Sequence, residues 1–316
     1  MKENRRVFFM ACCWLLSVLM AYGQDPLPER AKTDSHSAPV YLSEEMEKLM
    51  RFLPVSDSMP EAFSGVQENC ITDPTASLAS FWQKLSRLDK PVRIVHIGDS
   101  HVRSHIFPAV VRKLLEEDFG SDAVDNIPLT YQTSGIASET GKPGIVYHVI
   151  GINGATCSKF LTPKLLDEIE ELHPDMVILS FGTNEAHGRL YNEAKHTSDM
   201  NALLSSLKAR CPESAFLLTT PPGAYMRLSR SRRVVNTRTP LVVENELEFV
   251  REHALAVWDL YDIVGGSRHA CLNWTAANMY QRDKIHFTRE GYTLQGLLLH
   301  EALIKAYNDY VAIRLE

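Results

Sequence analysis

The sequence predicts an α/β protein, a three-layer sandwich with a central parallel β-sheet covered by helices on both faces. Short β-rich runs alternate along the chain with segments whose apolar residues recur at helical spacing. Such alternation is typical of a parallel sheet, which binds its ligands at the carboxyl ends of the strands. The chain has 316 residues, 45% of them hydrophobic, and can therefore bury one substantial core.

The elements of the main domain, expected over 75–316, follow from these patterns. Strands are predicted at 92–97, 176–181, 215–219 and 254–260. Helices are predicted at 75–88, 106–119, 161–172, 198–209, 241–253 and 290–310. Residues 121–149 are rich in Gly and Pro towards their middle and have no clear helical pattern, so this insertion is expected to be a long functional loop or a small β excursion.

Residues 1–23 have the features of a cleavable signal peptide. Basic residues precede an apolar run of about 15 residues at 7–21, which is shorter than the roughly 18 residues needed to span a bilayer. The alternative is an uncleaved N-terminal anchor. We expect a periplasmic or secreted protein with no membrane span after removal of the signal. Residues 24–74 begin with a polar, Pro-rich stretch and are expected to form a tether and a loosely packed arm.

Charge and cysteine content limit the partners and cofactors. The formal net charge of −6 becomes −8 once the signal segment is removed, and an acidic chain is a poor candidate for binding nucleic acid. In an exported protein, the four remaining cysteines could form two disulfides with three possible connectivities. They are Cys70, Cys157, Cys211 and Cys271. None lies at metal-binding spacing, so neither a metal nor another cofactor is expected.

The tripeptide Gly98-Asp99-Ser100 lies between a predicted strand and a predicted helix. A serine there can expose its hydroxyl at the sheet edge and act as a nucleophile if a base reaches it. The alternative is an ordinary helix N-cap, a position that serine favours.

A second candidate lies late in the chain, where Asp283 precedes His286 by three residues in a turn. The carboxylate can turn back to hold one imidazole nitrogen and leave the other free to take a proton from a serine. The alternative is a capping Asp beside an unrelated surface His.

Two further positions could stabilise an oxyanion. Asn184 follows the predicted strand at 176–181 and offers a side-chain amide, and Gly154 offers a backbone N–H from another loop. Alternatively, both are turn residues that tolerate positive φ.

Taken together, these blocks resemble those of the SGNH hydrolases, also called GDSL esterases, over about residues 92–310. The family's serine, glycine, asparagine and histidine blocks match Ser100, Gly154, Asn184, and Asp283 with His286. The resemblance implies a flavodoxin-like SGNH hydrolase fold and a Ser-His-Asp mechanism through an acyl-enzyme. The oxyanion would then be held by the N–H groups of Ser100 and Gly154 and by the Asn184 amide.

The sequence departs from the usual family pattern at His101 and Glu185. Gly-Asp-Ser-His is similar to the variant of bacterial peptidoglycan O-acetylesterases and related envelope esterases, so the expected partner is an acetylated carbohydrate. The expected function is a secreted serine esterase that removes O-acetyl groups from it. Two alternatives stay open: an O-acetyltransferase that resolves the same acyl-enzyme with a sugar hydroxyl, and a catalytically weak glycan-binding protein.

Five residues are candidates for substrate binding, namely His101, Glu185, His187, Arg227 and Arg230. The two arginines belong to an arginine-rich stretch at 221–240 that could hold carboxylates by bidentate hydrogen bonds, or could be a solvated basic loop. Glu185 and His187 could line the cleft or form a hydrogen-bond network behind it. His101 could instead be a partly exposed residue at the helix start without a catalytic role.

Overall fold

The computed structural model describes residues 52–125, 135–188, 190–229 and 232–315. The predictions for the signal peptide at 1–23, for the first part of the tether at 24–51 and for Arg230 lie outside these residues. No described helix is long and apolar enough to cross a membrane.

A five-stranded parallel sheet forms the centre of the fold, as predicted. Its strands occur in the order β2 (Gly144–Gly151), β1 (Pro91–Gly98), β3 (Met176–Ser180), β4 (Ala215–Thr219) and β7 (Ala256–Trp258). This is the order of flavodoxin-like folds, in which the chain reverses direction across the sheet between its first and third strands. A ligand site is therefore expected at the carboxyl ends of β1 and β3.

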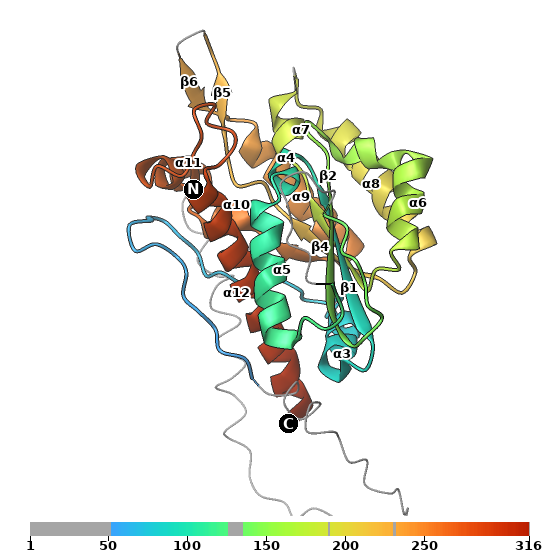
Figure 1. The fold of residues 1–316 in the computed structure, drawn as a ribbon. Helices are drawn as coiled ribbons and strands as arrows, with labels where there is room; N and C mark the ends of the chain where they lie inside the picture. The colour runs from blue at the N-terminus through green and yellow to red at the C-terminus, as the bar shows by residue number, and fades with distance from the viewer. Residues whose placement is uncertain (1–51, 126–134, 189, 230–231, 316) are drawn as a thin grey trace, which may run out of the picture. The chain divides into compact units, whose positions relative to one another are not determined.

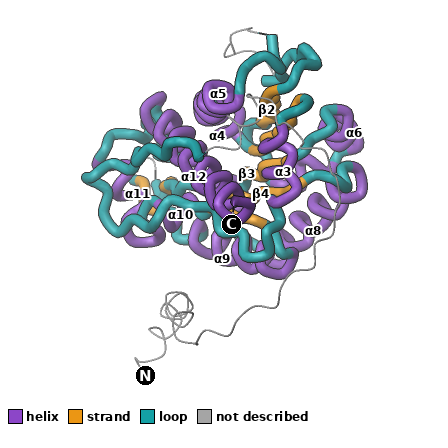
Figure 2. The backbone as a smooth tube through the Cα atoms, turned by 90° about the horizontal axis from the view of Figure 1, so that it is seen from below, coloured by secondary structure: helices purple, strands orange, loops and turns teal. Residues whose placement is uncertain are grey.

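Helices cover both faces of the sheet. Figures 1 and 2 show α5 (Ile106–Phe119) and α12 (Arg289–Leu315) on one face, and α6 (Pro163–Glu171) and α8 (Glu193–Arg210) on the other. The remaining helical segments are α3 (Ala79–Arg87), α4 (Ser100–Arg103), η1 (Cys157–Leu161), α7 (Thr183–His187), α9 (Thr239–His253), α10 (Leu260–Ile263) and α11 (Gly266–Ala276). The three-layer prediction is confirmed.

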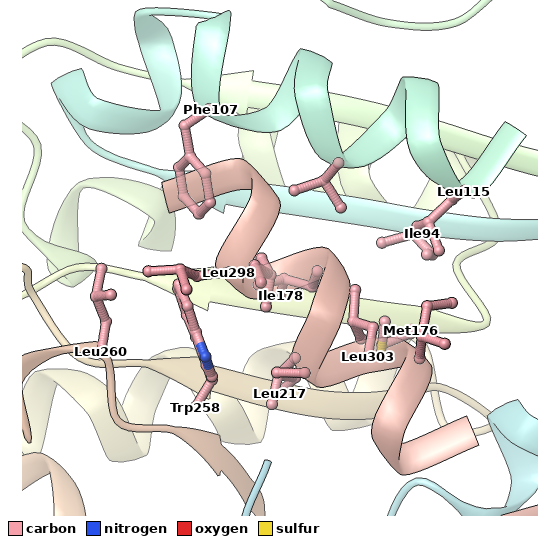
Figure 3. Close-up of a cluster of buried hydrophobic side chains, with 14 of the residues drawn as sticks. Ile94, Phe107, Leu115, Met176, Ile178, Leu217, Trp258, Leu260, Leu298 and Leu303 are labelled. Carbon is pink, nitrogen blue, oxygen red and sulfur yellow. The ribbon is translucent and has the colours of Figure 1, made fainter. Parts of the chain in front are cut away.

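The two faces of the sheet are packed by alternate residues of the same strands, as the period of a β-strand requires. Ile94, Ile178 and Leu217 point to the α5 and α12 side, where Figure 3 shows them with Phe107 and Leu298. Their chain neighbours, which include Val95, Val177 and Leu218, belong to the core on the opposite side. Because both faces of the sheet are buried, the sequences of these strands are continuous apolar runs.

The segment 121–149 is described at 121–125 and 135–149, and part of it is a strand of the central sheet. Its last six residues belong to β2, which pairs with β1 along its whole length and is buried. The prediction of a loop or a separate excursion is thus wrong for this part. An ion pair of 2.7 Å between Arg93 and Glu139 fastens the described loop before β2 to the sheet. The sequence signal was obscured by the Gly and Pro residues that precede the strand.

The prediction of a loosely packed arm is likewise wrong for residues 52–74. Leu53 and Phe63 are buried in the core, and the Asn69 side chain accepts a hydrogen bond of 2.9 Å from the Trp258 indole. Thr72 forms an antiparallel bridge with Val257 in β7. Because the segment is mostly polar in composition, its sequence did not indicate these few contacts with the core.

The cysteines do not form the two disulfides that export would permit. All four described cysteines are free, and Cys157, Cys211 and Cys271 are buried. Other elements also lack a predicted counterpart. They are α11, the antiparallel hairpin of β5 (Tyr225–Arg227) and β6 (Arg233–Val235), and the short segments α4, η1, α7 and α10.

Candidate active site

The end of β1 places Ser100 at the carboxyl edge of the sheet. A Cβ on Gly98 would lie 2.4 Å from the Val102 side chain and 2.5 Å from the Ser180 carbonyl oxygen, so only glycine lets the chain turn this close to β3. Asp99 then caps α4, because its Oδ1 accepts the N–H of His101 at 2.8 Å. Ser100 is therefore the first residue of a short helix.

The late loop brings Asp283 and His286 to this serine. The Ser100 Oγ lies 2.9 Å from Nε2 of His286, although the two residues are 186 positions apart. The other ring nitrogen, Nδ1, lies 2.6 Å from Oδ2 of Asp283. A short bridge between Tyr280 and Phe287 closes the loop that carries both residues.

Asp283 is stabilised in its ionised form. Partial burial raises its pKa, but hydrogen bonds from the His286 ring and from the backbone N–H groups of Ile285 and His286 outweigh this effect and lower the pKa below its usual value. An ionised carboxylate at Nδ1 favours the tautomer that carries its proton there. Nε2 is then free to accept the hydroxyl proton of Ser100.

Asn184 and Gly154 lie on adjoining loops. The Asn184 amide nitrogen donates to the Ala155 carbonyl oxygen at 2.9 Å and to Oδ2 of Asp99 at 3.2 Å. Gly154, next to Ala155, has φ of +70°, a conformation that favours glycine. The structure thus joins the Gly154 loop to the Gly-Asp-Ser tripeptide through Asn184.

Asp99 has an unusual protonation equilibrium. Burial, with a smaller contribution from the charge of Glu185, raises its pKa to about 8, although the hydrogen bond from the His101 backbone N–H lowers it. At neutral pH the Asp99 carboxyl group is therefore mostly protonated. The group that accepts the hydrogen bond from Asn184 is therefore a mostly neutral carboxyl group.

His101 lies behind His286. Its side chain is buried, its Nδ1 lies 3.1 Å from the Tyr292 hydroxyl, and its ring centroid is 5.6 Å from that of His286. Burial, with a smaller contribution from His286, lowers the pKa of His101 to about 3, so the ring is neutral. The residue supports the His286 ring and does not lie on the cleft surface, so the alternative of an exposed helix-start residue is also wrong. Nothing in the sequence indicated the contact with Tyr292.

Glu185 and His187 contact the protein framework. The two carboxyl oxygens of Glu185 accept the N–H groups of Cys157 at 2.8 Å and Gly182 at 2.9 Å. Burial raises the pKa of Glu185. The ring nitrogens of His187 face the carbonyl oxygens of Thr183 at 2.7 Å and Tyr225 at 3.3 Å. These contacts match the network expected as the alternative to direct cleft lining.

Arg227 lies on the β5–β6 hairpin, which borders the late loop. The N–H of Tyr225 donates to the Lys284 carbonyl oxygen at 2.9 Å, so the base of the hairpin is joined to the loop that carries His286. The Arg227 side chain is exposed, and its Nε donates to the Ser229 carbonyl oxygen at 3.2 Å. It contacts neither Ser100 nor His286.

A serine hydroxyl within hydrogen-bonding distance of an imidazole, which a carboxylate holds in turn, is the geometry of a serine hydrolase. Its position at the carboxyl edge of a parallel sheet places the protein among hydrolases with an α/β fold. Residues 97–294 match the model of the GDSL-like lipase/acylhydrolase family, and the chain belongs to this family. It is a carboxylic ester hydrolase.

One solved structure agrees with this fold, and two others are reported beside it. A peptidoglycan O-acetylesterase superposes with a TM-score of 0.64 at 17% sequence identity, covering 76% of this chain and 99% of its own. An acetylxylan esterase from Geobacillus stearothermophilus gives a TM-score of 0.45 at 15% identity, with coverage of 67% and 94%. A GDSL-like lipase from Bacteroides thetaiotaomicron gives 0.45 at 17% identity, with coverage of 72% and 99%. A search of curated proteins found no match.

Proposed function

We propose that this protein is a serine esterase that removes O-acetyl groups from a carbohydrate, with a cell-envelope glycan such as peptidoglycan as its substrate class. The observation that carries this proposal is the continuous contact from Ser100 through His286 to Asp283, at 2.9 and 2.6 Å. The substrate class is proposed from the Gly-Asp-Ser-His block and from the peptidoglycan O-acetylesterase that shares the fold.

The proposed reaction has two halves. His286 takes the proton of the Ser100 hydroxyl through Nε2, and the Ser100 oxygen attacks the acetyl carbonyl carbon. His286 then gives this proton to the departing sugar oxygen, which leaves an acetyl ester on Ser100. In the second half His286 takes a proton from a water molecule, whose oxygen attacks the acetyl carbonyl carbon. His286 then gives that proton to the departing Ser100 oxygen, so that acetate is released and the serine is regenerated. Asp283 holds the imidazole and stabilises its transient positive charge.

The oxyanion is proposed to be bound by the N–H groups of Ser100 and Gly154 and by the Asn184 amide. Both hydrogens of that amide are engaged in the free protein, so one must be released to the oxyanion. The longer contact, 3.2 Å to Asp99, is the one that we expect to break. Since Asp99 is mostly protonated at neutral pH, breaking this contact leaves no unpaired buried charge.

We further propose a periplasmic or secreted location, supported by the signal-peptide pattern at 1–23. Arg227 and Arg230 are proposed to bind acidic groups of the glycan. The proposed chemistry uses only the protein's own side chains, its backbone N–H groups and water. Fractionation of expressing cells and the N-terminal sequence of the exported protein test the location.

The function is tested by measuring free acetate released from O-acetylated peptidoglycan, acetylated xylan and acetylated pectin. We expect the purified protein to release acetate from peptidoglycan and Ser100→Ala to lose this activity while keeping the fold. Ser205→Ala, on the exposed side of α8, is the matched control and should retain activity. Undiminished release by Ser100→Ala would contradict the mechanism. Acetyl transfer to a glycan acceptor without acetate release would show that the protein is a transferase and not an esterase.

A further inference from the structure

A second group of polar side chains lies behind the proposed oxyanion loops. This buried cluster consists of Cys157 in η1, Glu185 in α7, His196 in α8 and Glu246 in α9. Ligand atoms of the first three lie within 4.8 Å of one another, and Nε2 of His196 lies 4.0 Å from Oε1 of Glu246. The four residues come from separate segments, and the helices α7, α8 and α9 that carry three of them are visible in Figure 1.

The buried cluster lacks hydrogen-bond partners that buried polar atoms normally have. Neither Nε2 of His196 nor Oε2 of Glu246 has a partner among the described residues, and both side chains are almost wholly buried. At 4.0 Å, His196 and Glu246 are too far apart to hydrogen-bond to each other. An unpaired buried polar atom is costly, so a species that bonds to both groups would stabilise the fold.

The space beside these groups is small. A cavity of about 20 Å³ lies next to Cys157 and Glu246, and its other walls are apolar, including Phe181, Met200 and Phe249. Such a volume admits one water molecule or one ion and no larger ligand. The apolar walls offer no hydrogen bonds, so an occupant of this cavity must bond to Cys157 and Glu246, which are its two polar lining residues.

The donor atoms decide which occupant fits. A thiol sulfur, an imidazole nitrogen and carboxylate oxygens are the ligand types that bind zinc and related divalent metals. The ligand atoms of Cys157, Glu185 and His196 lie close enough together to share one cation, and Glu246 lies beside His196. We propose that Cys157, Glu185, His196 and Glu246 bind one divalent transition-metal cation of the zinc type. Cys157 loses its thiol proton to solvent on binding, because the thiolate is the ligand form.

The surroundings of His196 support this assignment. Its Nδ1 lies 3.2 Å from the Tyr191 hydroxyl, which in turn accepts a hydrogen bond of 2.8 Å from the Asn245 amide. An outer contact on one ring nitrogen that leaves the other directed at the site is the usual arrangement of metal-binding histidines. Glu185 also accepts the N–H groups of Gly182 and Cys157, so the cation would fasten the loops that carry Asn184 and Gly154.

Metal content tests the proposal directly. The purified untagged protein is incubated with ZnCl₂, dialysed and measured by elemental mass spectrometry, and we expect about one zinc per chain. Cys157→Ser and His196→Gln should lose this zinc, whereas Cys211→Ser, a matched buried cysteine outside the cluster, should keep it. Substitution with Co²⁺ should produce thiolate-to-cobalt absorption that Cys157→Ser abolishes.

Stability supplies a readout independent of activity. Zinc should raise the Tm of the wild type by several degrees, and a chelator should reverse the rise. Glu246→Gln, which preserves shape, keeps the test informative if Cys157→Ser does not fold. A wild type that retains no zinc after dialysis would overturn the proposal. Equal zinc content in the wild type and in a folded His196→Gln or Glu246→Gln variant would also overturn it.

Discussion

The proposed active-site cluster of Ser100, Asp283 and His286 and the buried cluster behind it use similar groups in opposite ways. In the active-site cluster the imidazole contacts a partner on each side, and its side chain is 34% exposed. In the buried cluster the imidazole is 3% exposed, and its Nε2 has no partner among the described residues. The first is partly exposed to solvent, whereas the second is buried beside a cavity of about 20 Å³.

The comparison shows how the environment of a histidine sets its ability to exchange protons. Partial exposure and a paired carboxylate leave His286 able to exchange protons with a serine and a substrate. Burial without a paired charge lowers the pKa of His196 to about 4 and holds that ring neutral. Access to solvent thus separates a site suited to proton transfer from one suited to holding a ligand.

The largest expected effect tests the active-site cluster. His286→Ala should lower kcat on the order of 10⁵- to 10⁶-fold, because the serine then has no base. His196→Gln, the same ring type in the buried cluster, should change kcat by less than about tenfold. Both rates are measured on a small activated acetyl ester. Comparable losses in the two variants would contradict the division between the clusters.

Asp283→Asn should cost less, about 10⁴-fold in kcat, because the imidazole remains but loses its orientation and its charge partner. The measurement is kcat on the same ester, with circular dichroism to verify the fold. Asp262→Asn, a substitution on the short helix α10, is the control that should leave kcat unchanged. A tenfold or smaller effect of Asp283→Asn would show that Asp283 does not position His286.

Asn184→Ala should lower kcat about 10²- to 10³-fold, as expected for the loss of one oxyanion donor. The KM should change little, because the interaction forms in the transition state. Steady-state kinetics separates the two constants. An increase in KM with unchanged kcat would assign Asn184 to substrate binding.

A smaller effect is expected for His101→Leu, which should change how the unfolding free energy depends on pH. The folded-state pKa of about 3 for His101 is below the unfolded value, so its contribution is fully present above pH 6.5 and is lost as the pH falls towards 3. Each pH unit in this window costs about 1.4 kcal/mol of unfolding free energy. Urea unfolding between pH 7 and 5 should show a weaker pH dependence in His101→Leu. Equal slopes for the variant and the wild type would refute this.

The smallest expected effect belongs to the exposed hairpin. Arg227→Ala should raise KM for an acidic glycan ester by less than about tenfold, because solvent screens an exposed charge. The kcat and the KM for a neutral ester should not change. Arg251→Ala, exposed on α9, serves as the control, and added salt should reduce the difference between wild type and Arg227→Ala.

Much of the fold could be predicted from local patterns. The strands at β1, β3 and β4 were predicted to within a residue or two at each end, because each is a short apolar run bounded by polar or turn residues. β2 was not recognised, since Gly and Pro residues before it suggested a loop. The arm at 52–74 was misjudged because a few buried side chains anchor an otherwise polar segment.

The sequence by itself determined which groups are available: a serine after a strand, an Asp three residues before a His in one turn, and an Asn after another strand. The short-range pair of Asp283 and His286 is readable because both residues lie in one turn. Only the tertiary structure decided that Ser100 meets His286, that His101 is buried, and that Cys157, Glu185 and His196 from separate segments lie close together. These outcomes depend on parallel strands bringing distant segments to one edge and on the burial of each side chain, neither of which a local pattern contains.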